Sequence, residues 1–209
     1  MSRVPLLLVG AGGHARACID VIELDGRFAI TGLLGLPVEV GMNVMGYPVV
    51  GTDDDLAAAA SSAGSALIAV GQILNASPRQ GLFARLEHIE CTLPSVISPR
   101  AYVSRHATIG SGTIVMHGAV VNAGATVGRN CIVNSQALIE HDAIVGDHCH
   151  VATAAVVNGG VRIGTGSFVG SRAAIRQGVR IGDGCVIGMG LTVLTDCADG
   201  ERRPQPRVA

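Results

Sequence analysis

A six-residue repeat runs through the second half of the chain and constrains its fold more than any other feature. Counting from Ile97 to Val193, every sixth residue is Ile or Val, and no insertion breaks the frame. The last position of each unit is small in most repeats. A six-residue period corresponds to one side of a triangular coil, so three units close a coil and successive coils stack as parallel strands. The sequence therefore predicts a parallel β-helix.

The composition agrees with a β-helix whose interior is too narrow for aromatic side chains. Only 2% of residues are aromatic, there is no Trp, and there are 29 glycines. Cys131, Cys149 and Cys185 all occupy the last position of a unit, 18 and 36 residues apart. We expect these thiols to stack inside the β-helix as small apolar side chains, without disulfides or zinc.

The first 94 residues have a different pattern. The run from Leu6 to Val9 predicts a buried strand, a glycine turn follows, and Ala15 to Leu24 has helical spacing. Further strands are predicted at 29–34 and 66–70, and helices at 53–60 and 77–87, the last with Ser77 as its N-cap. This order indicates a small open parallel sheet with helices. We place the domains at 1–94, 95–196 and a charged, Pro-rich tail at 197–209, which we expect to be poorly ordered.

Charge and hydropathy exclude several classes of protein. The net charge is −1 and no basic run occurs, so we expect no nucleic acid partner. No apolar run is long enough to span a membrane, and the run at 4–10 is too short for a signal peptide, so we expect a cytoplasmic protein. All 15 basic residues are Arg, which excludes Schiff-base chemistry and Walker-type phosphate loops.

The glycine turn is a candidate phosphate site. Gly10, Gly12 and Gly13 match the start of a dinucleotide fingerprint, but Ala15 stands where its third glycine belongs. No acid ends the second predicted strand, which argues against NAD. The glycines still let backbone N–H groups approach a phosphate at a helix N-terminus. A tight turn that binds nothing is the alternative.

The length of one coil determines which histidines can lie close to one another. His141 and His150 are nine residues apart, which is half of one coil. On one β-helix they lie on opposite sides, so they share a site only where two protomers meet, as in a closed trimer. His148 follows Asp147 at another turn, and we expect it at the surface. His106 and His117 are turn residues with no partner at the right offset.

The two halves together resemble the bacterial hexapeptide-repeat nucleotide-sugar acyltransferases. This family includes enzymes that acetylate UDP-4-amino sugars for bacillosamine, relatives acting on GDP-perosamine, and sialic-acid O-acetyltransferase-like proteins. The motifs that carry the resemblance are the uninterrupted repeats, the turn ending at His14, and the segment Ile139-Glu140-His141-Asp142. The resemblance implies a Rossmann-like N-terminal domain, a left-handed β-helix, a homotrimer, acetyl-CoA as cosubstrate and a nucleotide-sugar acceptor.

The resemblance also implies roles for individual residues. His141 corresponds to the general base and Asp142 to the acid that orients it. The nucleotide-sugar contacts correspond to Ala11, Gly12, Gly13, His14 and Gly71, and the CoA contacts to His150, Gly170, Ser171, Gly188 and Met189. Bacillosamine members carry paired acids after the second strand, where this chain has Leu34-Gly35, and the family's closing G-x-P-A-[KR] turn is absent.

Several alternatives remain open on the sequence alone. A zinc site from His141, His148 and His150 would resemble the hexapeptide-repeat carbonic anhydrases, but the spacing does not match, and we expect no metal. The preferred function is N-acetylation of a nucleotide-linked 4-amino-6-deoxysugar. The alternatives are O-acetylation of a sugar, or nucleotide-sugar binding without catalysis. The nucleotide (UDP, GDP or dTDP), the sugar and the acyl chain are not determined.

Overall fold

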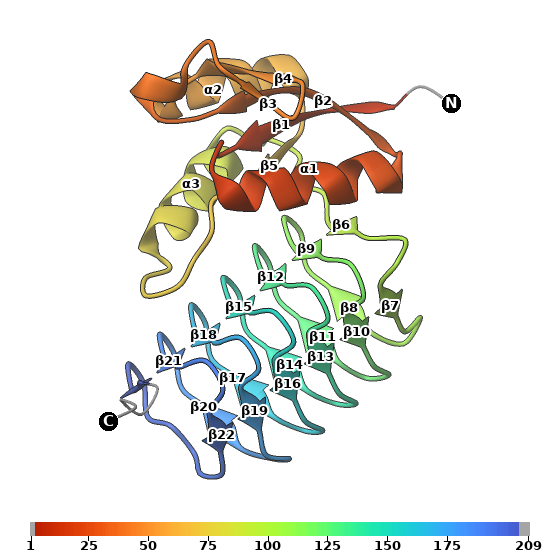
Figure 1. Ribbon diagram of the computed structural model, residues 1–209, viewed down its shortest axis with the longest axis vertical. Coiled ribbons are helices and arrows are strands. Elements are labelled where there is room, and N and C mark those ends of the chain that lie inside the picture. The colour runs from red at the N-terminus through yellow and green to blue at the C-terminus, as the bar shows by residue number, and fades with distance from the viewer. Residues whose placement is uncertain (1–2, 205–209) are drawn as a thin grey trace.

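The N-terminal α/β domain lies along one side face of a long β-helix in the computed structural model, which describes residues 3–204 (Figure 1). Its sheet has the strand order β3-β4-β2-β1-β5. Its elements are β1 (Val4–Val9), α1 (Gly13–Asp25), β2 (Phe28–Leu34), the 3-10 turn η1 (Pro37–Glu39), β3 (Asn43–Val44), β4 (Tyr47–Gly51), the 3-10 turn η2 (Asp53–Asp55), α2 (Leu56–Ala63), β5 (Ala66–Ile68) and α3 (Ser77–His88).

The sheet is parallel except at one edge. Strands β1, β2, β4 and β5 run parallel, and β3 pairs antiparallel with β4. Strands β3 and β4 were not predicted from the sequence, because they are short and Val49 is buried among exposed neighbours. Contrary to expectation, Ser77 is not the N-cap of α3. Ala76 takes that position, and the Ser77 N–H donates to Asn75 Oδ1 at 2.9 Å.

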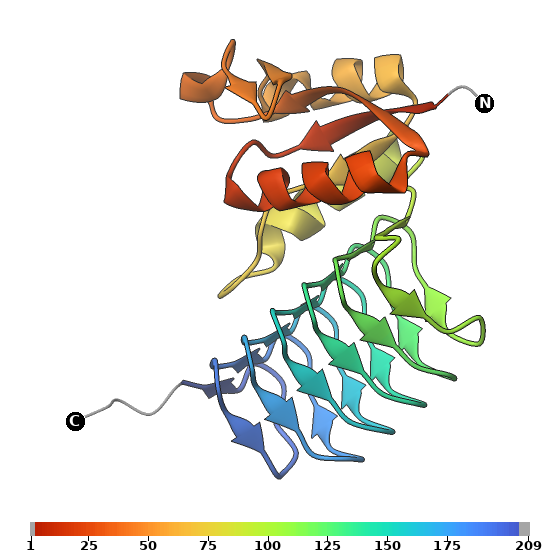
Figure 2. The same cartoon turned by 45° about the vertical axis from the view of Figure 1, so that its right-hand side comes forward.

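The repeats form a left-handed parallel β-helix, which confirms the predicted fold class. Strands of different coils pair 18 residues apart, for example Ile132 with His150, and they build three sheets (Figure 2). The strands are β6 (Val96–Ile97), β7 (Tyr102–Val103), β8 (Thr108–Ile109), β9 (Ile114–Val115), β10 (Val120–Val121), β11 (Thr126–Val127), β12 (Ile132–Val133), β13 (Leu138–Ile139), β14 (Ile144–Val145), β15 (His150–Val151), β16 (Val156–Val157), β17 (Arg162–Ile163), β18 (Phe168–Val169), β19 (Ala174–Ile175), β20 (Arg180–Ile181), β21 (Val186–Ile187), β22 (Thr192–Val193) and β23 (Arg202–Arg203).

The interior of the β-helix is filled by the Ile and Val of each unit and by the predicted thiols. Cys131, Cys149 and Cys185 are buried and free, and the Cys149 N–H donates to Cys131 Sγ at 3.4 Å. The thiol of Cys131 in turn donates to the Gly146 carbonyl at 3.1 Å. The stacking expected from the 18-residue spacing is therefore present.

The two domains share one hydrophobic core. Ile19 and Ile22 of α1 cluster with Ile114, Met116 and Ile132 of the β-helix, all of them buried. Ile114 and Ile132 occupy the first position of their units, whose side chains point outward from the coil. Because α1 rests on this face, the glycine turn that precedes it is held at a fixed place relative to the β-helix (Figures 1 and 2).

The tail continues the β-helix further than expected. Strand β23 pairs parallel with β21, so the expectation of poor order does not hold for residues 197–204. Arg203 stabilises this end by donating to the Thr195 and Asp196 carbonyls at 3.1 and 2.7 Å. Residues 205–209 lie outside the described part of the chain.

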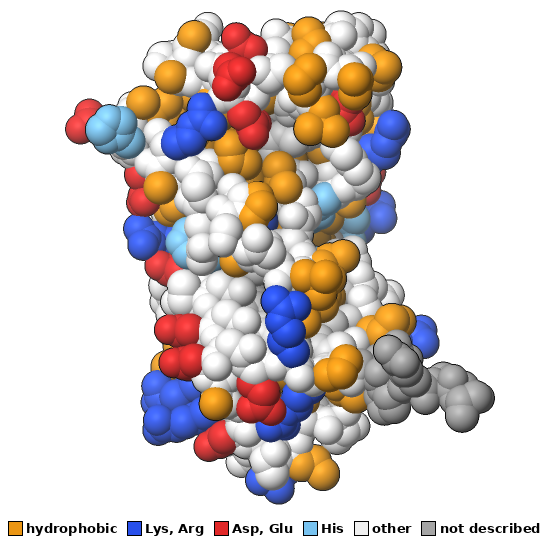
Figure 3. Space-filling model, turned by 90° about the vertical axis from the view of Figure 1, so that its left-hand side faces the viewer, with side chains coloured by type: hydrophobic (Ala, Val, Ile, Leu, Met, Phe, Trp, Pro, Cys, Tyr) orange, Lys and Arg blue, Asp and Glu red, His pale blue; other side chains and the backbone are white. Residues whose placement is uncertain are grey.

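The charged side chains are mixed over the surface. On the face shown in Figure 3, acidic and basic groups are interspersed, and neither sign forms one broad patch. Among residues 3–204, no helix is long and apolar enough to cross a membrane.

Candidate functional site

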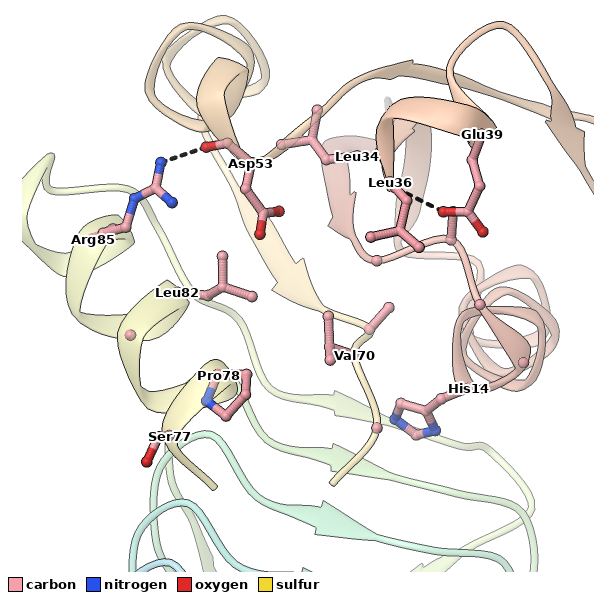
Figure 4. A pocket seen from close by; sticks show the side chains of 18 residues that line it. His14, Leu34, Leu36, Glu39, Asp53, Val70, Ser77, Pro78, Leu82 and Arg85 are labelled. Atoms are coloured by element: carbon pink, nitrogen blue, oxygen red, sulfur yellow. Dashed lines mark hydrogen bonds between the residues drawn. The ribbon is translucent and has the colours of Figure 1, made fainter. Parts of the chain in front are cut away.

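A cavity of about 610 Å³ opens at the carboxyl ends of β1, β2 and β5. This volume falls within the range of small-ligand sites. All five predicted nucleotide-sugar residues line it, together with side chains from η1, η2 and α3 (Figure 4). They are Ala11, Gly12, Gly13, His14 and Gly71. Glu39, Asp53 and Arg85 also line the cavity, and no sequence motif had marked them.

The N-terminus of α1 faces this cavity without a side-chain cap. Gly12 is the N-cap and makes no side-chain hydrogen bond, and the first turn holds no acid. A Cβ at Gly12 or Gly13 would meet nothing within 4 Å, whereas one at Gly10 would lie 2.9 Å from the Ala69 carbonyl carbon. Gly10 therefore lets the turn pack on β5, while Gly12 and Gly13 leave their backbone N–H groups open to an anion.

His14 adds a neutral imidazole to the cavity wall. Burial, with the nearby Arg79 charge and His150, lowers the pKa of His14 to about 3. Its Nε2 is buried and has no hydrogen-bond partner among the described residues. His14 can therefore hydrogen-bond a ligand but does not bring a positive charge.

The second predicted pair lies on an outer turn of the β-helix, between β13 and β14. His141 Nδ1 is 2.9 Å from Asp142 Oδ2, and both side chains are exposed. The hydrogen bond to Asp142, and the Asp142 and Glu140 charges, raise the pKa of His141. With Nδ1–H donated to Asp142, the Nε2 lone pair is free to accept a proton.

Two glycines in adjacent coils determine where this pair can lie. A Cβ on Gly159 would come within 2.7 Å of both Cε1 and Nε2 of His141. A Cβ on Gly124, in the preceding coil, would overlap the Asp142 carboxylate. The imidazole therefore rests directly on the Gly159 backbone, and a side chain at this position would displace it.

His150 is in a different environment. It is 8% exposed, and its Nδ1 donates to the Gln72 carbonyl at 2.5 Å. Asn134 Oδ1 accepts from the Ser135 N–H at 2.8 Å, so its Nδ2 is the atom that donates to His150 Nε2 at 3.2 Å. Burial lowers the pKa of His150 to about 4, so the ring is neutral with both nitrogens bonded. The 18-residue register places Ile132 one coil before His150, so Asn134, two residues further on, could have been expected close by.

Arg79 of α3 links the cavity wall to the β-helix. It is 1% exposed and donates to the Ile68 and Val70 carbonyls at 2.9 and 2.6 Å. Its other nitrogen donates to the carbonyl and side-chain oxygens of Asn130 at 3.1 and 2.7 Å. Burial lowers the pKa of Arg79 to about 10, which leaves it charged at neutral pH.

The four remaining CoA-contact predictions lie in two adjacent coils. Gly170 packs on the backbone of Gly188 and Met189, where a Cβ would lie 2.6 Å from the Met189 nitrogen. Ser171 is half-buried and Met189 is 55% exposed. These residues are thus brought together in the stacked turns that follow β18 and β21.

Two of the other histidines are not simple surface groups, contrary to expectation. His148 is half-buried, packs edge-on against Phe83 and lies 3.0 Å from Asn130 Nδ2. His117 bridges Ser98 and Asp20, each at 2.7 Å. The contacts to Phe83 and Asp20 were missed because these residues come from the N-terminal domain. Asn130 lies one 18-residue coil before His148, so the register could have indicated that contact.

The Ser98, His117 and Asp20 chain resembles a nucleophilic triad only in residue types. Ser98 is 1% exposed, and through His117 it is linked to Asp20 of α1, so the chain ties α1 to the β-helix. Within residues 3–204, no group of three His, Cys, Asp or Glu side chains is placed to hold a metal ion.

Family models match both parts of the chain. Residues 5–86 match the PglD N-terminal domain. Residues 106–141 match the bacterial transferase hexapeptide model, and residues 160–195 match the hexapeptide repeat of succinyl-transferase. No curated protein matches the chain.

Solved structures resemble the whole chain. The acetyltransferase domain of PglB from Neisseria gonorrhoeae FA1090 is 30% identical, with 98% of each chain covered and a TM-score of 0.88. GDP-perosamine N-acetyl transferase from Caulobacter crescentus, solved with CoA and GDP-perosamine, is 29% identical over 97% of this chain and 94% of that chain, with a TM-score of 0.89. WeeI from Acinetobacter baumannii AYE is 20% identical over 95% of each chain, with a TM-score of 0.74, and shows the fold alone.

Proposed function

Since the chain belongs to the hexapeptide-repeat acyltransferases that carry a PglD-type N-terminal domain, we propose that it acetylates a nucleotide-linked amino sugar. The acetyl group comes from acetyl-CoA, and the acceptor is the amino group of a 4-amino-6-deoxysugar. The observation that carries the proposal is the exposed His141–Asp142 pair, which presents a free Nε2 on the outer surface of the β-helix.

His141 acts as the general base. Its Nε2 takes a proton from the sugar amine as the nitrogen attacks the thioester carbonyl carbon. Asp142 accepts Nδ1–H, holds the ring in the required tautomer and stabilises the imidazolium. The C–S bond then breaks, the amide forms, and the imidazolium returns its proton to the leaving CoA sulfur. No acyl-enzyme is needed, which fits with Cys131 and Cys149 being buried.

The cavity of the N-terminal domain holds the nucleotide part of the acceptor. The uncapped N-terminus of α1 supplies backbone N–H groups for the diphosphate, and His14 adds a neutral hydrogen-bonding group. The sugar then extends from the cavity toward the β-helix. Figure 4 supports this direction, because His14 lies at the cavity end nearest the β-helix ribbons.

The complete site lies between protomers of a homotrimer. His141 lies on the turn after β13, whereas His150 lies on β15 in another sheet, so one protomer does not bring them together. In a trimer, His141 of one protomer faces the His150 side of its neighbour. CoA lies in the groove between them, beside Gly170, Ser171, Gly188 and Met189. Co-expressed His141→Asn and His150→Asn chains should then recover part of the activity that each loses alone.

The test is release of CoA thiol from acetyl-CoA with UDP-, GDP- and dTDP-linked 4-amino-6-deoxysugars. We expect turnover with one amino sugar and a loss of about 10²–10⁴-fold in kcat for His141→Asn. His106→Asn, which changes an exposed turn histidine elsewhere on the β-helix, is the matched control and should retain activity. If no amino sugar is turned over, N-acetylation is contradicted. Turnover of hydroxyl acceptors and binding of nucleotide sugars without catalysis would then be measured.

A further inference from the structure

The cavity of the N-terminal domain has two chemically different ends. Its lower end in Figure 4 carries His14 and the glycine turn, whose free N–H groups suit a diphosphate. Asp53 and Arg85 lie on the side of the cavity away from His14, whereas Glu39 lies on the His14 side, further from the β-helix. If the diphosphate lies at the glycine turn and the sugar points to the β-helix, the nucleobase reaches the side that carries Asp53 and Arg85. This placement of the base rests on the proposed function.

The walls between the two ends are apolar and suit a flat ring. Leu34, Val70, Pro78 and Leu82 line the cavity from β2, β5 and α3, and Leu36 covers its rim with 64% of its surface exposed. An aromatic base held between such side chains is removed from water on both faces. Polar groups at the end of the cavity then form hydrogen bonds with the edge of the base.

Asp53 and Arg85 form an acceptor and a donor side by side. The Arg85 guanidinium donates to the Asp53 backbone carbonyl, which holds the two residues on the same side of the cavity. The Asp53 carboxylate itself has no hydrogen-bond partner among residues 3–204, and the other guanidinium N–H groups of Arg85 are also free there. This edge of the cavity therefore offers two carboxylate acceptors next to cationic donors.

Glu39 is held differently and closer to the turn. Its Oε2 accepts the Leu36 N–H at 2.8 Å, and a Cβ at Gly35 would lie 2.7 Å from that oxygen. Gly35 thus allows the carboxylate to close over the end of β2. Carboxylates beyond the second strand of such sheets accept hydrogen bonds from ribose hydroxyls, which are present in every ribonucleotide.

We propose that the cavity selects a guanine nucleotide, with the Asp53 carboxylate accepting N1–H and N2–H, Arg85 donating to O6, and Glu39 binding the ribose. Guanine has two adjacent donors beside an acceptor, and a carboxylate takes such a donor pair in bidentate fashion. Uracil and thymine present a single N–H between two carbonyl oxygens. Those oxygens would be forced against the Asp53 carboxylate, which penalises pyrimidine nucleotides.

The test is equilibrium binding of GDP, IDP, UDP, dTDP and ADP to the full chain by calorimetry. We expect GDP to bind about tenfold or more tightly than UDP, with IDP, which lacks the N2 amine, in between. Asp53→Asn should remove the preference for GDP, by weakening GDP and by relieving the penalty against UDP so that UDP binds more tightly. Glu39→Gln should weaken GDP and UDP by the same factor. Asp54→Asn, a neighbouring exposed acid that does not line the cavity, is the matched control and should change neither.

Two outcomes would overturn the base assignment alone. These are tighter binding of UDP or dTDP than of GDP, or an Asp53→Asn variant that weakens all nucleotides equally. In both cases the cavity still binds a nucleotide, so the proposed function stands. If no nucleotide binds to the wild-type chain, the nucleotide role of the cavity fails as well. Thermal melting of each variant separates loss of binding from loss of folding.

Discussion

His141 and His150 are nine residues apart, yet the fold gives them opposite chemistry. His141 lies on an outer turn with 61% of its side chain exposed, and Asp142 raises its pKa. His150 lies in the junction between the domains, where burial lowers its pKa to about 4. The same side chain is a free base in one region and a neutral, fully bonded group in the other. Position in the coil, rather than residue type, therefore decides which histidine can accept a proton.

The two regions are also held together differently. The outer turn depends on neighbours in sequence or in adjacent coils, namely Asp142, Gly124 and Gly159. The junction depends on contacts between domains, such as Arg79 to Asn130 and Gln72 to His150. Changes in the outer turn should therefore affect catalysis with little effect on folding. Changes in the junction should affect folding first.

The largest effect is expected from Arg79→Met. Met fills similar space, but the oxygens of Ile68, Val70 and Asn130 lose the donor that now binds them. Each buried acceptor left unpaired costs about 1–3 kcal/mol, so we expect the free energy of unfolding to fall by about 3 kcal/mol or more. Urea unfolding measures this directly. Arg176→Met, at an exposed site on the β-helix, should change it little. Equal values for the two variants would show that the junction does not depend on Arg79.

The difference between the outer turn and the domain junction also explains which features could be predicted from the sequence. The β-helix was predictable because each unit of six residues repeats one local rule, so the repeat frame alone places His141 and Asp142 on a turn. The glycine turn was predictable because Gly10, Gly12 and Gly13 lie within four residues of one another, directly after an apolar run.

The junction was not predictable by such rules. Arg79 meets Asn130 across 51 residues, and no spacing marks that contact. Glu39 and Asp53 reach the cavity through two 3-10 turns, and the fold of this segment depends on the short strands β3 and β4. Pairings of this kind are set by tertiary packing, which a local pattern does not encode.

A smaller effect, confined to catalysis, is expected from Gly159→Ala. A Cβ at Gly159 would lie 2.7 Å from His141 Nε2, so the imidazole must move away from the position it now holds. A displacement of about 1 Å costs roughly 10²-fold in rate, and we expect that loss in kcat with the KM for the nucleotide sugar unchanged. The unfolding free energy should stay close to that of the wild type.

A double-mutant comparison tests whether this effect passes through His141. In a His141→Asn background, Gly159→Ala should cause no further loss of kcat, because the displaced base is already absent. Gly160→Ala places a methyl group in open space one residue away, and at φ +66° it costs about 1–2 kcal/mol of stability, but the folded variant should retain most of its kcat. A full additional loss in the double mutant would instead assign Gly159 a role independent of His141.

Acidification should distinguish the two regions by the sign of its effect on stability. Burial lowers the pKa of His14 to about 3 and of His150 to about 4, whereas both titrate near 6.5 when unfolded. Between pH 6.5 and 4 the unfolded chain therefore binds protons that the folded chain does not. Stability should fall in this window by about 1.4 kcal/mol per pH unit for each of these histidines.

Two matched variants test this difference between the regions. For each, the free energy of unfolding in urea is measured from pH 7 to pH 4.5. His14→Gln removes one buried histidine and should make the dependence on pH shallower by about 1.4 kcal/mol per unit. His141→Asn should not make it shallower. Because Asp142 raises the pKa of His141, that pair contributes stability at low pH and loses it as the pH rises through the folded pKa. If both variants flatten the curve equally, the opposite protonation behaviour of the two regions is wrong, and with it the assignment of His141 as the only free base of the pair.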